Sequence, residues 1–496
     1  MFQFSFLDII LYLVVILALL ILKPLFQILL MKMKYGKKMF MIYFPLLGRG
    51  IQFKNQIQKY NDLYHFEKMI PQENPEVEMI VSNSFMGLTH VFLKPDHIKF
   101  ILQNQDLYKK ATKVFLFGDK MFYKGLVFQE GDEWKLARNV LSKSFEFDQL
   151  RARIPLIKRL CEEKFQSVQE NEPINIINIS GNIVGEVITQ SFFSQSFKDL
   201  NGKTFLSELV NVLVSIISQY REAPYRCISR AFIFGESDYP DWTLSSVEKQ
   251  LLARLQNIKE ILRVSIKERQ QMQNKPADFL TAYINTIQQN PNLTEEHAIQ
   301  QYIMLIFAGI DTTSHLFGAC CYALSIHPEW QKKLREEIQK QYGTYEQLNN
   351  ENINLSSFIT NFINECMRMY TPVPYFVERE VKQDHKVGEY FLKKNSQVQL
   401  CILPNNYDAK NFPDPFKFNP DRWNKQIMDP FIFLPFSTGK RNCIGQHMAL
   451  MEVKCLLIYL LMNFEVSLSG EKQVWSMKFV YTIQDDKFIQ LKRIAK

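Results

Sequence analysis

A cysteine flanked by glycines and an arginine is the residue of this chain best suited to bind a metal. Cys443 follows Arg441 and precedes Gly445, shortly before an apolar stretch with a helical pattern. A thiolate at the start of a helix is stabilised by the helix dipole and by free backbone N–H groups, which also moderate how strongly the sulfur donates electron density to a metal. Gly439 and Gly445 let the backbone approach a flat ligand, and Arg441 can pair with an anionic group on the rim of that ligand. The segment 436–445 therefore predicts an iron ligated by a thiolate.

A long helix is predicted over 294–326, with a suitable N-cap at its start and acidic residues in its first turn. At 1.5 Å per residue it spans about 45 Å, enough to cross a large domain. Its apolar middle is interrupted by Asp311 and Thr312, whose burial costs free energy unless they are hydrogen-bonded. Gly309 weakens the helix here, and the Thr312 hydroxyl can bond back to the Ala308 carbonyl. The pattern is that of a kinked core helix whose polar groups are satisfied or of a buried acid and alcohol placed for chemistry.

Two further pairs have helical spacing. Trp134 and Arg138 lie four residues apart, and Glu365 and Arg368 lie three apart in a short helix predicted over 361–370. Each pair alone favours an ordinary amphipathic helix, because such spacings are common and exposed ion pairs contribute little.

In this order along the chain, the segments resemble the cytochrome P-450 superfamily, the haem-thiolate monooxygenases, from about Tyr43 to the end of the sequence. The cysteine loop has the spacing of the haem-binding loop of that family. The resemblance implies haem b (iron protoporphyrin IX) with the Cys443 thiolate as axial iron ligand. It assigns cofactor binding to Phe436, Gly439, Arg441, Cys443, Gly445, Trp134, Arg138 and Arg379.

The resemblance also implies roles for the polar residues of the helices. Asp311 is the expected relay acid and Thr312 the alcohol on the oxygen-binding side of the haem. A buried structural triad is expected from Glu365, Arg368 and Arg422, the last from a proline-rich stretch before the cysteine loop. Covalent haem attachment is not expected, because Ala308 stands where one branch of the family has an ester-forming glutamate.

Length and composition favour one large catalytic domain. The 496 residues contain no linker of low complexity, and 47% hydrophobic residues are ample for a core. The expected fold is mainly α with a small β lobe, the cytochrome P-450 fold preceded by one N-terminal transmembrane helix. We predict a membrane anchor over 1–31, a basic linker over 32–50 and a haem-thiolate catalytic domain over 51–496.

The first residues predict the location. The run 9–22 is uninterrupted apolar sequence and, with its upstream neighbours, approaches the roughly twenty residues of a spanning helix, with Asp8 as the one exception. A cleaved signal peptide is disfavoured because Lys23 and Pro24 follow in place of a small-residue cleavage site. Basic residues occur only after the run, which places the large domain in the cytoplasm. The resemblance points to a single-pass protein of the endoplasmic reticulum membrane.

The net charge and the motifs limit the kinds of partner that we expect for this protein. The formal net charge of +8 is modest and the basic residues are dispersed, so nucleic acid is not expected. The chain shows no glycine-rich dinucleotide fingerprint, so electrons must come from outside. The resemblance implies a flavoprotein donor, NADPH-cytochrome P-450 reductase, together with dioxygen and a small lipophilic substrate. The expected lining of the substrate pocket is 108–123, 303–307, 373–377 and residues around Phe479.

Two alternative functions share these motifs. One is a haem-thiolate isomerase or dehydratase that acts on lipid hydroperoxides, and the other is a non-catalytic haem-binding protein. Isomerases of this fold generally lack the acid–alcohol pair, so Asp311 and Thr312 favour the monooxygenase.

Overall fold

The chain folds into two compact units. The computed structural model describes residues 6–45, 48–84, 87–111, 124–195, 197, 204–222, 230, 240–349, 351–354, 356–425, 429–470 and 473–494. We call the first unit, which comprises 1–111, 374–417 and 427–434, the strand-rich unit, and the second, which comprises 112–373, 418–426 and 435–496, the helical unit.

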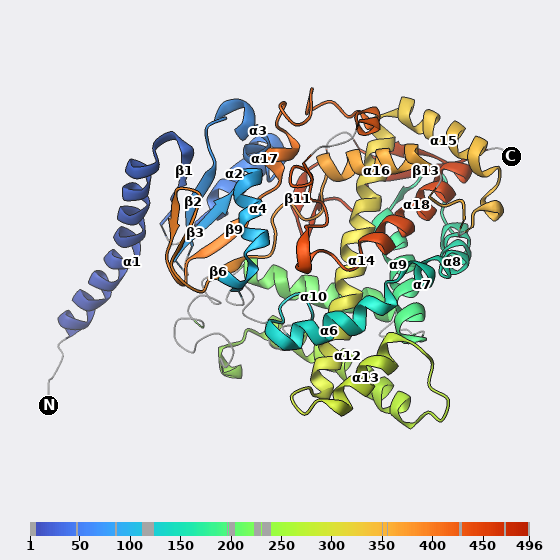
Figure 1. Ribbon diagram of the computed structural model, residues 1–496, viewed down its shortest axis with the longest axis horizontal. Helices are drawn as coiled ribbons and strands as arrows, with labels where there is room; N and C mark the ends of the chain where they lie inside the picture. Colours follow the sequence, from blue (N-terminus) through green and yellow to red (C-terminus); the bar gives the residue numbers. More distant parts are fainter. Residues whose placement is uncertain are drawn as a thin grey trace. The chain divides into compact units, whose positions relative to one another are not determined.

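The strand-rich unit is built on a mixed six-stranded sheet in the order β1-β2-β3-β9-β6-β4 (Figure 1). Its strands are β1 (Met39–Ile42), β2 (Met79–Ser84), β3 (Gly87–Phe92), β4 (Tyr108–Lys110), β6 (Arg379–Val381) and β9 (Gln397–Leu400), with a hairpin of β7 (His385–Val387) and β8 (Tyr390–Leu392) beside them. Its helices are α1 (Phe6–Tyr35), α2 (Gly50–Tyr60), α3 (His65–Glu73), α4 (Pro95–Gln103) and α17 (Leu403–Asn406). Side chains of α1, α4 and the sheet form one buried apolar cluster.

Helix α1 changes character along its length. Ile28 and Tyr35, near its end, are buried in the cluster of the strand-rich unit. The Tyr43 hydroxyl donates a hydrogen bond to the Ile21 carbonyl (2.6 Å). The segment 32–50, which the sequence predicted to be a linker, contains the end of α1 and β1, which pairs in parallel with β2. The last turns of α1 are therefore part of the unit's core.

The helical unit holds most of the helices. Its helices are α6 (Gly131–Ser144), α7 (Phe147–Arg151), α8 (Ile154–Gln166), α9 (Ile176–Phe193), α10 (Phe205–Glu222), α12 (Ser246–Gln271), α13 (Phe279–Gln289), α14 (Glu295–Ile326), α15 (Pro328–Tyr342), α16 (Ser357–Met369) and α18 (Gln446–Asn463). Its strands form a sheet in the order β10 (Phe464–Leu468), β13 (Ile489–Arg493), β5 (Pro173–Ile174), and a hairpin of β11 (Trp475–Met477) and β12 (Tyr481–Ile483).

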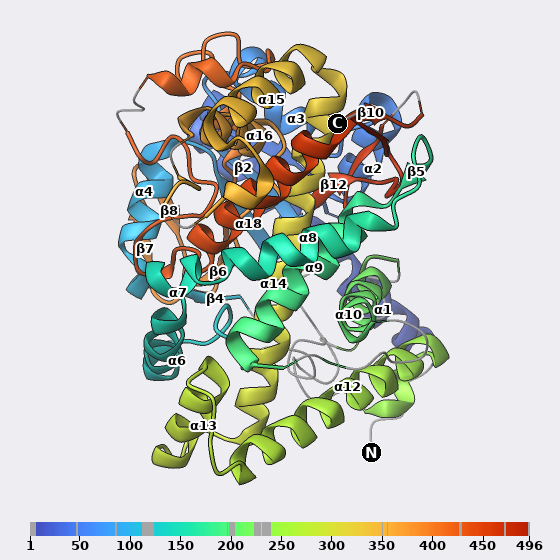
Figure 2. The same cartoon turned by 90° about the vertical axis from the view of Figure 1, so that its right-hand side faces the viewer.

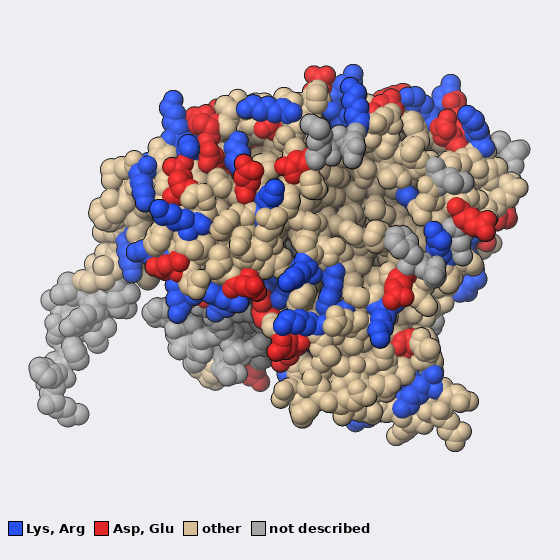
Figure 3. All heavy atoms as spheres, in the orientation of Figure 1, with Lys and Arg blue, Asp and Glu red and all other residues tan. Residues whose placement is uncertain are grey.

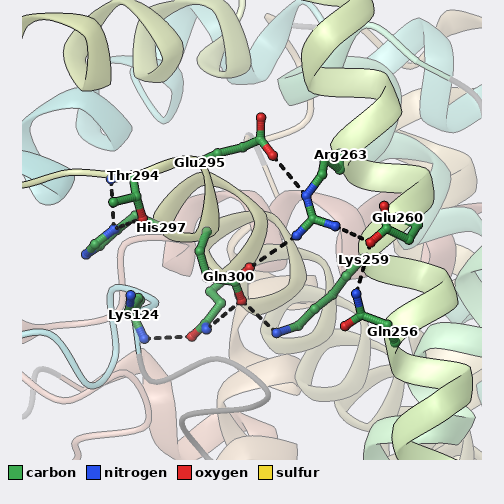
Figure 4. Close-up of polar contacts among 10 residues, drawn as sticks. Lys124, Gln256, Lys259, Glu260, Arg263, Thr294, Glu295, His297 and Gln300 are labelled. Atoms are coloured by element: carbon green, nitrogen blue, oxygen red, sulfur yellow. Dashed lines mark hydrogen bonds and ion pairs between the residues drawn. The ribbon is translucent and has the colours of Figure 1, made fainter.

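Helix α14 is the longest helix of this unit and confirms the helix predicted over 294–326 (Figure 2). Within the described part of the chain it is the helix long and apolar enough to cross a membrane, but 78% of that apolar window is buried inside the protein. Its Thr294 N-cap donates a backbone hydrogen bond to His297 Nδ1 (3.0 Å). Its first turns are tied to α12, where Glu296 accepts from Lys259 Nζ at 2.6 Å (Figure 4). The helix is thus a fixed core element.

Glycines let α14 and α9 pack closely. A Cβ on Gly185 of α9 would lie 2.7 Å from Ile310 Cδ1, and one on Gly181 would lie 3.3 Å from Ile310 Cγ2. On α14, a Cβ on Gly309 would overlap Ile188 Cδ1. Since buried contacts shorter than van der Waals distance force neighbours to shift, these glycines fix the segment that carries Asp311.

Candidate active site

The cysteine loop is closed by backbone hydrogen bonds just before α18. The Cys443 N–H donates to the Phe436 carbonyl (2.9 Å), and the Asn442 N–H donates to the Gly439 carbonyl (3.1 Å). Gly439 has a φ of +77°, in the left-handed region that favours glycine. The helix after the loop begins at Gln446, which confirms the helical pattern expected shortly after the cysteine. Cys443 therefore lies at the N-terminal end of α18, on a tightly held turn.

Cys443 is exposed to solvent, but the protein around its thiol affects the ionisation of that group. The residue is exposed to solvent, yet nearby protein removes enough solvation to raise the pKa of the thiol. The Gly445 backbone, by a hydrogen bond, and the charge of Arg138 shift this pKa in the opposite direction. Without a metal these contributions leave the thiol protonated near neutral pH, whereas a coordinated metal ion deprotonates it outright.

Two arginines connect the loop to α6, namely Arg138 of that helix and Arg441 of the loop itself. Arg138 donates to the Asn442 carbonyl (2.9 Å) and to Asn442 Oδ1 (2.7 Å). The Arg441 guanidinium lies 4.2 Å from the centroid of the Trp134 ring, and its Nη2 donates to Glu130 Oε2 (3.0 Å). Helix α6 thus brings Trp134 and Arg138 to the cysteine loop.

The arrangement of these side chains fits a flat anionic cofactor. The observation that supports this fit does not depend on the sequence motif. Arg441 Nη1 is buried and has no hydrogen-bond partner among the described residues. A buried guanidinium N–H without an acceptor is unfavourable unless a bound group supplies one. Arg441 could therefore hold a carboxylate of such a cofactor while Cys443 ligates its metal.

Arg379, which the resemblance also assigned to the cofactor, is the first residue of β6 in the strand-rich unit. It is buried, and its Nη1 donates to the Val377 carbonyl (3.1 Å). Its role at the cofactor stays a prediction.

Glu365 is the centre of a buried polar cluster. It accepts from Arg368 Nε and Nη2 (both 2.9 Å) on α16 and from Arg422 Nε (3.0 Å). Trp423 Nε1 (2.9 Å) and the Asn419 N–H (2.9 Å) complete the set, and neither was predicted from the sequence. Both Glu365 and Arg368 are fully buried. The contacts of the predicted triad are present, and they join α16 to the segment 419–423.

Helix α16 begins earlier than predicted. It runs over Ser357–Met369 where the sequence indicated 361–370, because the Ser356 side chain accepts from the Ile359 N–H (3.2 Å) and caps the helix.

The acid and the alcohol of α14 differ in how well they are satisfied. The Thr312 hydroxyl donates to the Ala308 carbonyl (2.7 Å), the bond expected from the sequence. Asp311 is 3% exposed, and its Oδ2 has no hydrogen-bond partner among the described residues. Burial raises the pKa of this carboxyl. Thr312 is fixed with its lone pairs free to accept, beside an acid that tends to hold its proton.

The predicted pocket lining is only partly described. Residues 112–123 lie outside the described part of the chain. In the helical unit, Phe307 of α14 packs against Phe479, with ring centroids 4.6 Å apart, and Ile303 is buried one turn earlier. An apolar surface therefore continues along α14 towards Asp311.

A mainly helical fold with small sheets, a cysteine before a late helix and a long core helix with an acid–alcohol pair together define a haem-thiolate oxygenase. Comparison with known proteins agrees. The family model described as Cytochrome P450 matches residues 44–489. The chain is 28% identical to Cytochrome P450 3A13 of Mus musculus over 399 residues, 77% of each chain. It is 29% identical to Cytochrome P450 3A9 of Rattus norvegicus (77% of each chain) and 27% identical to Cytochrome P450 3A7 of Homo sapiens (80% and 81%).

The chain belongs to the cytochrome P450 family. It is accordingly a haem monooxygenase, an oxidoreductase whose cofactor is haem b with a cysteine thiolate as axial ligand. It uses a redox partner, dioxygen and a lipophilic substrate.

We predict that Glu365→Gln lowers the free energy of unfolding by about 3–5 kcal/mol, because it leaves a buried guanidinium without its counter-charge. The matched control is Glu336→Gln, which removes an exposed ion pair with Lys332 (side chains 62% and 79% exposed) and should change stability by less than about 0.5 kcal/mol. Chemical denaturation followed by circular dichroism measures both. Equal denaturation midpoints for Glu365→Gln and the unmodified protein would contradict the structural role of the cluster.

Proposed function

We propose that Cys443 is the thiolate that ligates the haem iron and that Arg441, Arg138 and Trp134 hold the propionates. When bound, haem supplies the activation of dioxygen that lets one oxygen atom enter the substrate while the other leaves as water. The observation that carries this proposal is the accessible Cys443 thiol at the start of α18, beside Arg441 with its unpartnered buried nitrogen. Phe436, Gly439 and Gly445 shape the loop, and Arg379 remains the proposed fourth propionate ligand.

The chain's own residues supply protons and orientation. Because its proton is engaged with the Ala308 carbonyl, the Thr312 hydroxyl can accept a hydrogen bond on the side where dioxygen binds. Asp311, whose pKa burial raises, is the proton donor behind it. This intact pair supports a monooxygenase in preference to an isomerase of lipid hydroperoxides, which needs no proton delivery to dioxygen.

We predict that Thr312→Ala uncouples the enzyme. NADPH and dioxygen are still consumed, but the amount of product per NADPH falls about tenfold or more. The reason is that the variant lacks the hydroxyl through which the Asp311 proton is delivered. The test compound is any lipophilic molecule that shifts the haem spectrum on binding, and the readout is the ratio of product to NADPH.

Thr313→Ala is the matched control, since Thr313 is a buried neighbour on the same helix that the proposal does not use. It should keep the coupling of the unmodified protein. Full coupling in Thr312→Ala, or an equal loss in Thr313→Ala, would contradict the relay.

We further infer that the electron donor is NADPH-cytochrome P-450 reductase, which docks near the cysteine loop. Lys440 lies in this loop, and Lys143 lies in the last turn of α6, which Arg138 ties to the loop. Both lysines are exposed. On the face seen in Figure 3, basic and acidic side chains are interspersed. Exposed lysines on the cysteine loop and on the helix tied to it support docking of an acidic flavoprotein, whereas the dispersed charges elsewhere do not favour nucleic acid.

The membrane association of the protein is proposed from α1. Leu19, Leu22 and Phe26 are about 60% exposed (59%, 59% and 63%), which is unfavourable in water and favourable in lipid. No lysine precedes Lys23, and Lys32, Lys34, Lys37 and Lys38 follow Phe26. We propose a single-pass anchor within 1–31 in the endoplasmic reticulum membrane, with the catalytic domain in the cytoplasm.

We predict that deleting residues 1–20 releases the protein from membranes during an alkaline carbonate wash and leaves its unfolding midpoint unchanged. Deleting residues 1–35 should release it too but cost several kcal/mol, because Ile28 and Tyr35 leave the core. Sedimentation and thermal unfolding measure the two effects. Retention of the shorter deletion in the washed pellet would place the anchor elsewhere.

A further inference from the structure

A histidine that the catalytic proposal has not used contacts the relay acid. His315 lies one helical turn after Asp311 on α14, and both are buried. His315 Nδ1 is 2.6 Å from the Asp311 carbonyl oxygen and 3.6 Å from Asp311 Oδ1. Because a carbonyl oxygen only accepts hydrogen bonds, Nδ1 carries a proton. A donor nitrogen is therefore held facing the carboxyl group.

A lysine from a distant part of the chain also acts on this carboxyl. Lys478 follows β11, in the turn of the β11–β12 hairpin, and its charge favours the ionised form of Asp311. Lys478 Nζ also donates to Asp486 Oδ1 (2.5 Å), and these two side chains are 30% and 41% exposed. The lysine is thus ion-paired with a carboxyl that faces solvent, and its charge also favours the ionised form of the buried Asp311.

The other surroundings of Asp311 are apolar or uncharged. Among the described residues, the charged groups that act on its carboxyl are His315 and Lys478. Helix α9, packed along α14, approaches Ile310 and Ser314 with Gly181 and Gly185. Two cationic or ionisable partners therefore oppose the effect of burial on Asp311.

We propose that His315, held one helical turn from Asp311 with its Nδ1–H facing the carboxyl group, stabilises the carboxylate that Asp311 becomes when it gives up its proton. His315 is a positioning residue for the relay, so this inference rests on the proposed function, and Lys478 and Asp486 serve as electrostatic probes of the same carboxyl. A proton donor works best when its proton affinity matches the working pH, and a carboxyl buried alone would hold its proton too tightly.

The proton balance gives each group a definite part. Asp311 releases the proton of its carboxyl towards Thr312 and becomes a carboxylate. His315 Nδ1–H and the Lys478 ammonium stabilise that negative charge until bulk water returns a proton to Asp311. No electron transfer or further reactant is involved in this step.

The test is the pH midpoint at which the Asp311 carboxyl ionises, read from the infrared carbonyl band that Asp311→Asn removes. His315→Leu, which removes the N–H donor that faces the carboxyl group, should raise the midpoint by about one pH unit. Lys478→Met should raise it by less. Asp486→Asn should lower it, because the lysine charge is then shared with one carboxyl fewer.

The control is Lys332→Met, which removes an exposed lysine elsewhere in the helical unit and should leave the midpoint unchanged. Opposite shifts for Lys478→Met and Asp486→Asn are expected from an electrostatic cause and not from a general loss of structure. With reductase, NADPH and no substrate, the alkaline decline of dioxygen consumption should move with the midpoint.

An unchanged midpoint in the His315 variant, or shifts of Lys478→Met and Asp486→Asn in the same direction, would overturn the inference. So would the absence of any band sensitive to Asp311→Asn across the pH range of the folded protein, because the carboxyl would then be ionised throughout. A protein without a thiolate-type haem spectrum would contradict the proposed function instead, and the infrared midpoints, which need no turnover, would still decide this inference.

Discussion

The ionisation of one cysteine beside the N-terminus of α18 is the constraint on which the rest of the site depends. Partial burial raises the pKa of Cys443, so the thiolate forms at neutral pH only when a cation compensates it. The loop supplies part of that compensation through the Gly445 backbone and Arg138, and a metal ion supplies the rest. The loop hydrogen bonds from Asn442 and Cys443, and the packing of Arg441 on Trp134, hold the sulfur and the cofactor donors on one rigid turn.

Two buried acidic side chains in the helical unit differ in how many hydrogen bonds they accept. This difference separates a structural role from a chemical one. Glu365 accepts hydrogen bonds from Arg368, Arg422, Trp423 and the Asn419 backbone, and such a fully paired group resists change. Among the described residues, Asp311 Oδ2 has no hydrogen-bond partner, and His315 Nδ1 lies 3.6 Å from Asp311 Oδ1. A carboxyl held in this way can gain and lose a proton. The close packing of α9 against Gly309 keeps this less satisfied group in a fixed position.

Sequence patterns predicted the parts of the fold that local rules determine. Helix α14 and the start of α18 follow from caps and apolar periodicity, and the Thr312–Ala308 bond follows from the helical repeat. The first turn of α16 was missed because Ser356 is a cap with no other signal around it. Likewise, a basic composition suggested a linker over 32–50, whereas pairing with β2 turns part of it into the strand β1.

Within the site, predictability depended on sequence separation. The pairs Glu365–Arg368 and Asp311–His315 have helical spacing. The contact of His315 with Asp311 could therefore have been predicted from its position four residues after Asp311. The effect of the Lys478 charge on Asp311 depends on the folding of a hairpin far along the chain, which no spacing reveals. The same holds for Trp423, whose contact with Glu365 depends on tertiary packing.

The absorption spectrum of the reduced protein with carbon monoxide tests the central claim most directly. The account predicts the strongly red-shifted Soret band of a thiolate-ligated haem, and its loss in Cys443→Ala while Cys455→Ala, a change at a buried cysteine of α18, keeps it. A folded, haem-replete protein that lacks this band, or a Cys443→Ala variant that retains it, would contradict the assignment of Cys443 as the iron ligand.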